Sequence, residues 1–349
     1  MHATERPPEI VIGLDVGGAN TKAAVVEGDA PARIASEPLE LWRRPEALAD
    51  MIASVVGRLG LDHAPVALTT TAELVDVFAN KREGVLSVLD ATQRALPARR
   101  LRIITTAGEL ISLDDARTQP LRCAAANWVA TAMLVARSVP HAILLDCGGT
   151  TSDLIPILAG EVAARGRSDL ERLLEGELVY TGALRTNIAA VLSHVPIGGS
   201  PCPVSSELFA ISADAHILRG HLTAAQCTCT FPDGRGTSPA EVRSRLARVV
   251  CADPEQLAGG DLDAIAAAVE EAQITSIAAA LQRVAARVPA GTRVIAVGIG
   301  AFLGRAAAER CGLPVDTDAG PVSPLRGSGG EVAAAVALSV LGRDQYQQR

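Results

Sequence analysis

An α/β fold made of two related lobes is the fold class that this sequence predicts. Short apolar runs typical of β-strands alternate with segments of helical spacing along most of the 349 residues. One pattern occurs twice, at residues 10–27 (IVIGLDVGGANTKAAVVE) and 142–157 (AILLDCGGTTSDLIPI): a strand, an aspartate, two glycines, small polar residues and a second strand. The two aspartates are 131 residues apart, which indicates a duplicated domain rather than a short repeat.

The first lobe is expected to continue from its hairpin through alternating helices and strands. Pro45 near the first turn and Gly60 at the end are typical of helix termini, so we predict a helix between them. A strand, a helix, a second strand and a linking helix with small residues on one side are predicted to follow, at 66–70, 84–95, 101–105 and 123–137.

The second lobe is expected to open with the hairpin at 142–157. Loops are predicted at 196–203 and 231–239, helices at 240–250 and 261–288, and a strand, glycine turn and helix from 293. A further loop, 321–331, precedes the last helix. We therefore predict a first lobe over 1–140, completed by a closing helix at 331–342, and a second lobe over 141–330 with an inserted substrate region at about 160–290.

Composition argues against several classes of protein. The net charge is −7 and only 2% of residues are aromatic, which disfavours a nucleic-acid-binding surface. Seven scattered cysteines fit a reducing compartment. The longest apolar stretches, such as 332–341, are too short to cross a membrane, and no signal peptide precedes the first strand. We expect a cytoplasmic protein with small-molecule substrates and neither nucleic acid nor membrane as partner; a homo-oligomer is compatible with this.

The two aspartate–glycine hairpins form the strongest candidate site. Their glycines allow positive φ and bring backbone N–H groups close to a ligand; they are Gly17, Gly18, Gly148 and Gly149. Short side-chain donors follow them, namely Asn20, Thr21, Thr150 and Thr151. Asp15 and Asp146 end the first strands and are suited to hold a hydrated Mg²⁺ that bridges phosphate oxygens. Two such hairpins facing a cleft would clamp a diphosphate or triphosphate, whereas a single one is also compatible with an ordinary turn.

A third glycine turn, with Gly298 and Gly300, follows a strand and opens a helix. A nucleotide can lie against such a backbone, but close packing of strand on helix explains the glycines equally well.

In this order the elements resemble the actin/sugar kinase/Hsp70 ATPase superfamily, over almost the whole chain. The corresponding parts are the two phosphate hairpins, the linking helix, an adenosine-type turn at 294–304 and the closing helix. The resemblance implies a duplicated ribonuclease H-like fold of two lobes with a central cleft. It does not imply a function, because this fold carries many.

Several segments resemble more closely the hydantoinase/oxoprolinase-related proteins, in particular the branch that acts in methanofuran biosynthesis and tetrahydromethanopterin-linked C1 transfer. They include VIGLDVGGANTKAAVVEG, TTAELVDVFANKREGV, LLDCGGTTSDLIPI and ELVYTGALRT. The resemblance implies a transferase that joins an aminomethylfuran-methyl diphosphate to the phenol oxygen of γ-glutamyltyramine and releases diphosphate. Mg²⁺ on Asp15 and Asp146, the glycine turns and the charge of Lys22 would stabilise the leaving group. ATP can bind such a fold but is not required by this reaction.

Other polar residues are candidates with equally plausible structural roles. Glu73 is a candidate base for the phenol proton and Lys81 a substrate contact, or both belong to a solvated helix start. Further substrate contacts are predicted at Asn127, Tyr180, Arg185, Asp233 and Arg235, the last two in a loop suited to cover a polyanion. Cys202, His216, His221, Cys227 and Cys229 invite a zinc site, although their spacing lacks the usual paired Cys-x-x-Cys.

Two other functions remain open at this point. The first is an ATP-dependent small-molecule kinase or hydantoinase/oxoprolinase-like hydrolase, which would bind nucleotide at the third glycine turn. The second is a nucleotide-sensing protein that kept the phosphate-binding hairpins without turnover.

Overall fold

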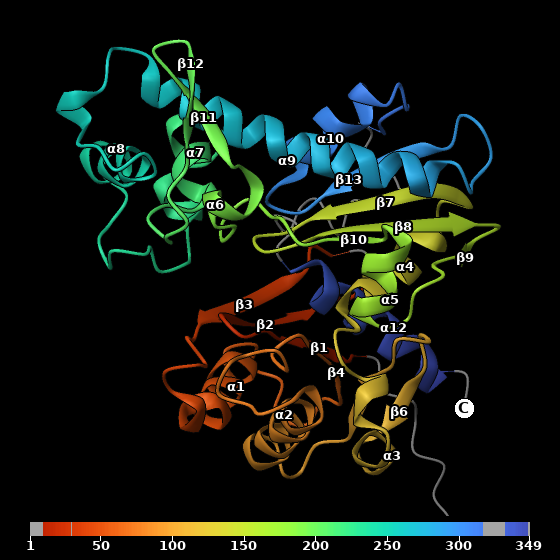
Figure 1. Ribbon diagram of the computed structural model, residues 1–349. Coiled ribbons are helices and arrows are strands. Elements are labelled where there is room, and N and C mark those ends of the chain that lie inside the picture. The colour runs from red at the N-terminus through yellow and green to blue at the C-terminus, as the bar shows by residue number, and fades with distance from the viewer. Residues whose placement is uncertain (1–9, 29, 317–331, 348–349) are drawn as a thin grey trace, which may run out of the picture. The chain divides into compact units, whose positions relative to one another are not determined.

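The chain is described here by a computed structural model that covers residues 10–28, 30–316 and 332–347, so the whole loop predicted at 321–331 lies outside the described residues. These residues form two compact units (Figure 1). The first contains the described residues within 1–142, 157–172 and 318–349; the second contains 143–156 and 173–317.

A six-stranded mixed sheet is the frame of the first unit. Its strands lie in the order β3-β2-β1-β4-β5-β6, with β1 antiparallel to β2 and parallel to β4. Their bounds are β1 Ile12–Val16, β2 Asn20–Val25, β3 Arg33–Pro38, β4 Val66–Thr70, β5 Leu101–Ile104 and β6 Leu110–Ser112. The hairpin and the two strands predicted for this part are confirmed.

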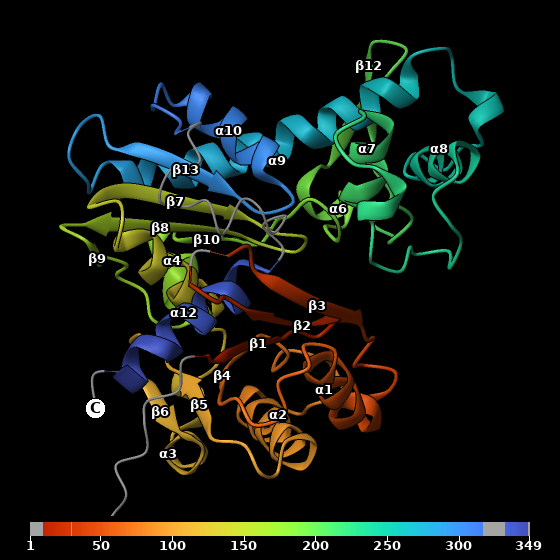
Figure 2. The same cartoon turned by 180° about the vertical axis from the view of Figure 1, so that it is seen from behind.

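Helices cover both faces of this sheet, as opposite views show (Figures 1 and 2). On one face are α1 (Leu48–Gly57), after a short 3₁₀ turn at Pro45–Ala47, and α2 (Lys81–Ala95). On the other are α4 (Asn127–Ala136) and the closing helix α12 (Ala333–Gln347). The first unit also contains α3 (Leu113–Thr118), η2 (Pro120–Arg122), β9 (Glu161–Val162) and the start of α5 (Asp169–Glu175).

Alternation along β1 explains how both faces are covered. Ile12, Leu14 and Val16 enter the hydrophobic cluster that contains the apolar residues of α1 and α2. Gly13 points the other way, where a Cβ would lie 1.8 Å from the carbonyl oxygen of Ala335 in α12. Glycine is therefore required at this position for α12 to pack directly on β1.

The sheet of the second unit repeats the order of the first. Its strands lie in the order β10-β8-β7-β13, with β9 also paired to β8. The bounds are β7 His141–Cys147, β8 Ser152–Leu158, β10 Leu178–Val179 and β13 Arg293–Val297. The central hairpin β7–β8 thus occupies the place of β1–β2, which confirms the internal repeat.

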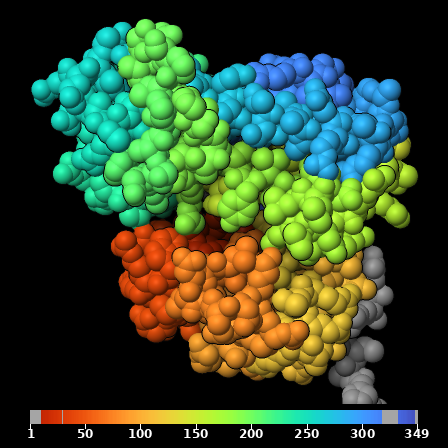
Figure 3. Space-filling view, viewed as in Figure 1, coloured from red at the N-terminus to blue at the C-terminus, as the bar shows by residue number. Residues whose placement is uncertain are grey.

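One long helix, α9 (Asp261–Ala285), organises the rest of this unit. Its C-terminal half packs with α10 (Ala301–Arg310) on the sheet, and its N-terminal half belongs to a second hydrophobic cluster. That cluster also contains residues of α6 (Ile188–Val191), α7 (Ser212–Leu218) and α8 (Pro239–Arg248), which gather at one end of α9 (Figure 3). Although α9 is long and apolar enough to cross a membrane, half of its most apolar stretch is buried within the protein, as in a core helix.

Several helix boundaries and one loop differ from the sequence prediction; for example, α2 begins at Lys81 rather than 84 and α9 ends at Ala285 rather than 288. The linking helix begins at Asn127 rather than 123, after η2, and the closing helix continues to Gln347. The prediction of a loop at 196–203 is wrong, because residues 194–203 form a β-hairpin of β11 (His194–Ile197) and β12 (Ser200–Pro203). Gly198 and Gly199 both have positive φ, so they make the two-residue turn that matches the twist of paired strands. The prolines in both strands obscured this turn signal in the sequence.

Candidate functional site

The two glycine turns have the same backbone hydrogen bond. The N–H of Gly17 donates to the carbonyl of Asn20 at 2.9 Å, and the N–H of Gly148 donates to the carbonyl of Thr151 at 2.8 Å. Both donors and both acceptors are 131 residues apart, the spacing of the two aspartates. The sequence repeat is therefore also a repeat of backbone conformation.

Neighbouring segments hold each turn by donating hydrogen bonds to its carbonyl groups. In the first unit, Leu41 donates its N–H to the carbonyl of Gly18 at 3.1 Å. In the second unit, the N–H groups of Ala183 and Leu184 donate to the carbonyls of Gly148 and Gly149, both at 2.9 Å. Because C=O and N–H point in opposite directions across a trans peptide, this support directs the following N–H groups away from it, where they can bind an anion.

Asp15 is a buried carboxylate of β1, close to the first glycine turn. It pairs in register with Lys22 of β2 and Thr69 of β4. Burial raises the pKa of Asp15, and the positive charge of Lys22 acts in the opposite direction. Among the described residues, Oδ1 of Asp15 and Oγ1 of Thr69 have no hydrogen-bond partner. These oxygens fit a cation or its bound water; Thr69 carried no motif that would have singled it out.

Glu73 lies in the loop after β4, which packs against the first turn. Thr71 donates its N–H to the carbonyl of Val16 at 3.0 Å, and a Cβ on Gly18 would lie 2.5 Å from the side chain of Val75. The parallel pairing of β1 and β4 brings their carboxyl ends to one edge, and so places the loop there.

Glu73 is 2% exposed, and burial raises the pKa of its carboxyl to about 7. The backbone N–H groups of Glu73 and Ala125 oppose the rise, Asp169 adds to it and Lys81 opposes it. Oε2 has no hydrogen-bond partner in the part of the chain that the structure describes. A carboxyl group that is half ionised near neutral pH is suited to accept a proton.

An ion pair stands beside Glu73. Nζ of Lys81, the first residue of α2, lies 2.6 Å from Oδ2 of Asp169 at the start of α5. The close approach of α2 depends on Gly84, because a Cβ there would lie 2.6 Å from the Cα of Glu73. Sequence analysis named Lys81 but missed Asp169, since 88 residues separate the two and no local pattern links them.

The start of α4 contributes a strained residue and a stacked cation. Ala125, two residues before the helix, has φ of 49°, a left-handed conformation that disfavours residues other than glycine. Asn127 is half-buried at the first helical position. Trp128 packs in the core, as expected, with the guanidinium carbon of buried Arg172 4.2 Å from the centre of its ring system.

In the second unit, the third glycine turn packs directly on the second hairpin. Gly298 has φ of 88°, and a Cβ there would lie 2.3 Å from the carbonyl oxygen of Cys147 and 2.6 Å from Oδ1 of Asp146. Gly300 donates its N–H to the same Cys147 carbonyl at 2.8 Å. Close packing of strand on helix therefore accounts for both glycines, and nucleotide binding at this turn stays a prediction. Burial raises the pKa of Cys147 to about 12, so its thiol stays protonated.

The remaining predicted contacts of this unit are spread over its surface. Tyr180 and Arg185 are exposed; Tyr180 precedes the segment that supports the second turn, and Arg185 belongs to it, since its N–H donates to the carbonyl of Gly149 at 2.8 Å. Asp233 is held by a structural ion pair, 3.1 Å from buried Arg245, and also accepts the N–H of exposed Arg235. Arg245 in addition contacts Asp214 and stacks on Phe231.

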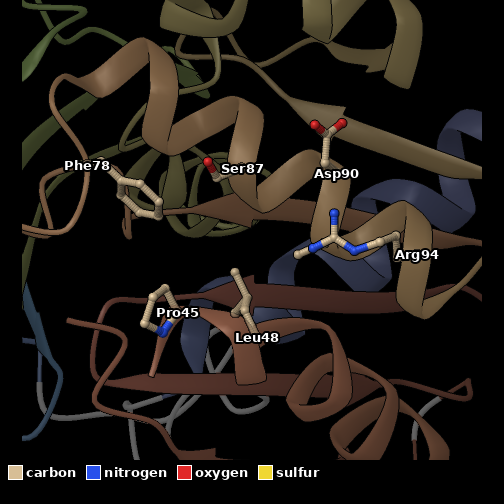
Figure 4. Close-up of a pocket in the computed structure, with 7 residues that line it drawn as sticks. Pro45, Leu48, Phe78, Ser87, Asp90 and Arg94 are labelled. Carbon is tan, nitrogen blue, oxygen red and sulfur yellow. The ribbon is translucent and has the colours of Figure 1, made fainter. Parts of the chain in front are cut away.

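No group of three histidine, cysteine or acidic side chains among the described residues is arranged to hold a metal ion. Of the residues considered for zinc, His216 bonds to Gln273 and the ring of His221 stacks on Phe302. A pocket of about 240 Å³ lies elsewhere, between the start of α1 and α2 of the first unit (Figure 4). Phe78, Ser87 and Arg94 are among its lining residues, and none of the predicted site residues is.

Comparison with known proteins agrees with these features. A family model described as hydantoinase/oxoprolinase matches residues 65–341. The (4-{4-[2-(gamma-L-glutamylamino)ethyl]phenoxymethyl}furan-2-yl)methanamine synthase of Methanocaldococcus jannaschii is 35% identical over 254 residues, which are 72% of this chain and 75% of that protein. The enzyme of the same name from Methanococcus vannielii is 36% identical over 121 residues, 35% of this chain and 54% of that protein.

Among solved structures, nucleotide-free acetone carboxylase superposes with a TM-score of 0.62 at 12% identity, over 94% of this chain and 70% of that one. With the duplicated sheets, this likeness confirms the predicted fold of the actin/sugar kinase/Hsp70 ATPase type. Because the family model spans most of the chain and a relative matches nearly three quarters of it, the chain belongs to the hydantoinase/oxoprolinase family.

Proposed function

We propose that this chain is a synthase of methanofuran biosynthesis that makes an ether between a furfuryl carbon and a phenol oxygen. The name of the matching synthases describes a phenoxymethyl group on a furan that carries an aminomethyl substituent. A reaction that fits this product joins an aminomethylfuran-methyl diphosphate to the phenol of γ-glutamyltyramine. The enzyme is then a transferase of an aryl-methyl group with diphosphate as leaving group.

The reaction balances with one proton transfer. The phenol oxygen forms a bond to the furfuryl carbon, the bond from that carbon to the diphosphate oxygen breaks, and the phenolic proton moves to a base. An ordinary phenol has a pKa of about 10, so a base is needed near neutral pH. Glu73 is the residue we assign to this step, because its buried carboxyl has a pKa of about 7 and a free oxygen among the described residues.

The glycine turns are proposed, each in its own unit, as binding elements for phosphate oxygens. Their N–H groups would stabilise the charge that develops on the leaving diphosphate without having to reorganise. Lys22 beside Asp15 supplies a positive charge in the first unit. Lys81, Asn127, Tyr180, Arg185 and Arg235 are kept as candidate contacts to the substrates.

A magnesium ion is the cofactor that this site would take. The unpartnered buried Oδ1 of Asp15 fits such an ion, with Asp146 as the equivalent carboxylate of the other unit. When bound to a diphosphate, Mg²⁺ neutralises charge on the leaving group. Asp15 would hold the ion, and Thr69 would accept or donate a hydrogen bond beside it. The positive charge of Lys22 would limit the total charge of the site.

The buried carboxyl of Glu73 is the observation that carries this proposal. Purified protein incubated with both substrates, Mg²⁺ and no nucleotide should yield the ether and diphosphate in equal amounts. Glu73→Gln should lower kcat by a factor of about 10²–10⁴, the usual contribution of a general base. Glu46→Gln, at an exposed position of the same unit, is the control and should leave the rate unchanged.

An absolute requirement for ATP would contradict the proposal. It would favour the alternative of an ATP-dependent kinase or hydrolase, which would bind nucleotide at the turn that contains Gly298 and Gly300. Thermal-shift measurements with ATP, ADP and inorganic diphosphate separate the two, because only the alternative predicts a preference for adenine nucleotides.

A further inference from the structure

The second glycine turn depends on a neighbouring segment, residues 181–186, for its conformation. The N–H groups of Ala183, Leu184 and Arg185 donate to the carbonyls of Gly148 and Gly149 at 2.8–2.9 Å. Gly182 touches the turn itself, since a Cβ there would lie 2.5 Å from the nitrogen of Thr150. Any shift of this segment would therefore rotate the peptide groups that are proposed to bind phosphate.

One carbonyl oxygen anchors the segment to the rest of the unit. The oxygen of Gly182 accepts hydrogen bonds from Oγ of Ser212 at 2.8 Å, Oγ1 of Thr186 at 3.0 Å and Nε2 of Gln273 at 2.8 Å. A carbonyl has two lone pairs, so three donors saturate it. The donors from Ser212 and Gln273 come from α7 and α9, which fixes the segment against two helices.

Gln273 is fully buried in the middle of the apolar helix α9. A buried amide is costly unless its hydrogen bonds are satisfied, and here both ends of the group are used. Nε2 donates to Oγ1 of Thr181 and to Gly182, each at 2.8 Å, and Oε1 lies 2.8 Å from Nε2 of His216.

His216 determines which way this amide points. Burial lowers the pKa of His216 to about 4, so the ring is neutral near pH 7. Its Nδ1 is buried without a hydrogen-bond partner among the described residues, which places the single proton on Nε2. Nε2–H then donates to Oε1 of Gln273, and the amide NH₂ is turned toward Gly182.

We propose that Gln273 is a positioning residue that, oriented by His216, holds the second glycine turn in its anion-binding conformation through the carbonyl of Gly182. The inference deepens the proposed function, because it rests on phosphate binding at this turn. Gln273 donates its hydrogen bonds to Thr181 and Gly182, so its effect on the turn passes through residues 181–186.

Gln273→Met tests this inference, since methionine keeps the length of the side chain and removes both donors. Amide hydrogen exchange is measured for residues 147–152 and 181–186 of the full chain, together with the affinity for inorganic diphosphate in the presence of Mg²⁺. Of the hydrogen bonds that Gln273 donates, only the one to Gly182 reaches the carbonyl that anchors residues 181–186. Its loss should speed exchange in both segments, and raise the Kd, by about tenfold, as expected for one lost hydrogen bond at this carbonyl. Ile265→Val, a buried change on the same helix remote from residues 181–186, is the control for general loss of stability and should alter neither.

A second variant keeps the test decisive if Gln273→Met does not fold. Ser212→Ala removes another donor to the same carbonyl and should produce the same pattern more weakly. Wild-type exchange in both segments for either folded variant would overturn the inference. If the wild-type protein binds no diphosphate, the proposed function fails instead, and the exchange rates still decide whether Gln273 holds the turn.

Discussion

The ammonium of Lys81 lies 2.6 Å from the carboxylate of Asp169, and the two charges act in opposite directions on the buried carboxyl of Glu73. Lys81→Met removes the charge that lowers the pKa of Glu73, so we expect that pKa to rise above about 7. Asp169→Asn removes the charge that raises it, so the pKa should fall. The rising limb of the pH–rate profile should move to higher pH in the first variant and to lower pH in the second.

Infrared spectroscopy of the carboxyl band, assigned by its loss in Glu73→Gln, measures the same pKa without turnover. If the pKa of Glu73 shifted in the same direction in both variants, the ion pair would act on Glu73 by some route other than its charges. Arg82→Met, an exposed neighbour on α2, serves as the control for loss of a positive charge.

Stability should depend on pH through Glu73. The pKa of Glu73 is raised from 4.5 to about 7 in the folded state, so the folded protein favours the protonated carboxyl. The contribution of this carboxyl to the free energy of unfolding is therefore present in full below pH 4.5. As pH rises from 4.5 through 7, the free energy of unfolding should fall by about 3 kcal/mol relative to Glu73→Gln, because ionisation is easier in the unfolded chain. Urea denaturation of both proteins at several pH values measures this difference; parallel curves would contradict it.

Asp15→Asn should separate stability from binding. Burial raises the pKa of Asp15, so replacing the carboxyl by an amide removes a desolvation cost and the melting temperature should stay the same or rise. The Mg²⁺-dependent affinity for inorganic diphosphate should fall at least tenfold if this carboxylate holds the ion. Calorimetry and titration provide the two values, with Asp50→Asn on the exposed side of α1 as control. Unchanged diphosphate binding would remove Asp15 from the site.

Gly13→Ala should destabilise the first unit by displacing α12. The new methyl group would lie 1.8 Å from the carbonyl oxygen of Ala335, and backbone atoms on both sides must move, at a cost of about 3 kcal/mol. Gly57→Ala is the matched control in the same unit, because a Cβ there meets nothing within 4 Å and alanine favours a helix. Chemical denaturation should show a loss for the first variant and no loss for the second; equal midpoints would contradict the close packing of α12 on β1.

Arg245→Met should destabilise the second unit strongly. Arg245 is fully buried between Asp214 and Asp233, and its removal leaves the Asp214 carboxylate buried without its main partner. Breaking a buried pair in this way costs about 3–5 kcal/mol. Arg243→Met, an exposed position on the same helix, should change the unfolding free energy by less than about 0.5 kcal/mol. A small loss for Arg245→Met would mean that the two aspartates become protonated instead.

The fold was largely predictable because its evidence is local. The two glycine hairpins, strand β4 and helix α9 follow from patterns within one element, and the duplication follows from comparing two such patterns. The hairpin at His194–Pro203 was missed because prolines on both sides of Gly198 and Gly199 outweighed the turn signal. The linking helix was placed four residues early because Cys123 and the three alanines before Asn127 share the apolar character of the helix itself.

The candidate site was predictable only where a motif names its residues. Asp15, Glu73 and the glycines were singled out by sequence, whereas Asp169, Thr69 and Gln273 were not. Each of these three lies beside a residue of another strand or helix, and no local sequence pattern reveals which distant residue that is.

The amino-acid sequence alone determined that the chain contains two strand–aspartate–glycine hairpins and an α/β framework to hold them, since hydrophobic period and glycine placement act over a few residues. Tertiary structure decided which charges surround Glu73 and which amide supports the second turn. The reason is physical: burial and electrostatic environment depend on residues brought together from distant parts of the chain, such as Lys81 with Asp169 and Gln273 with Gly182.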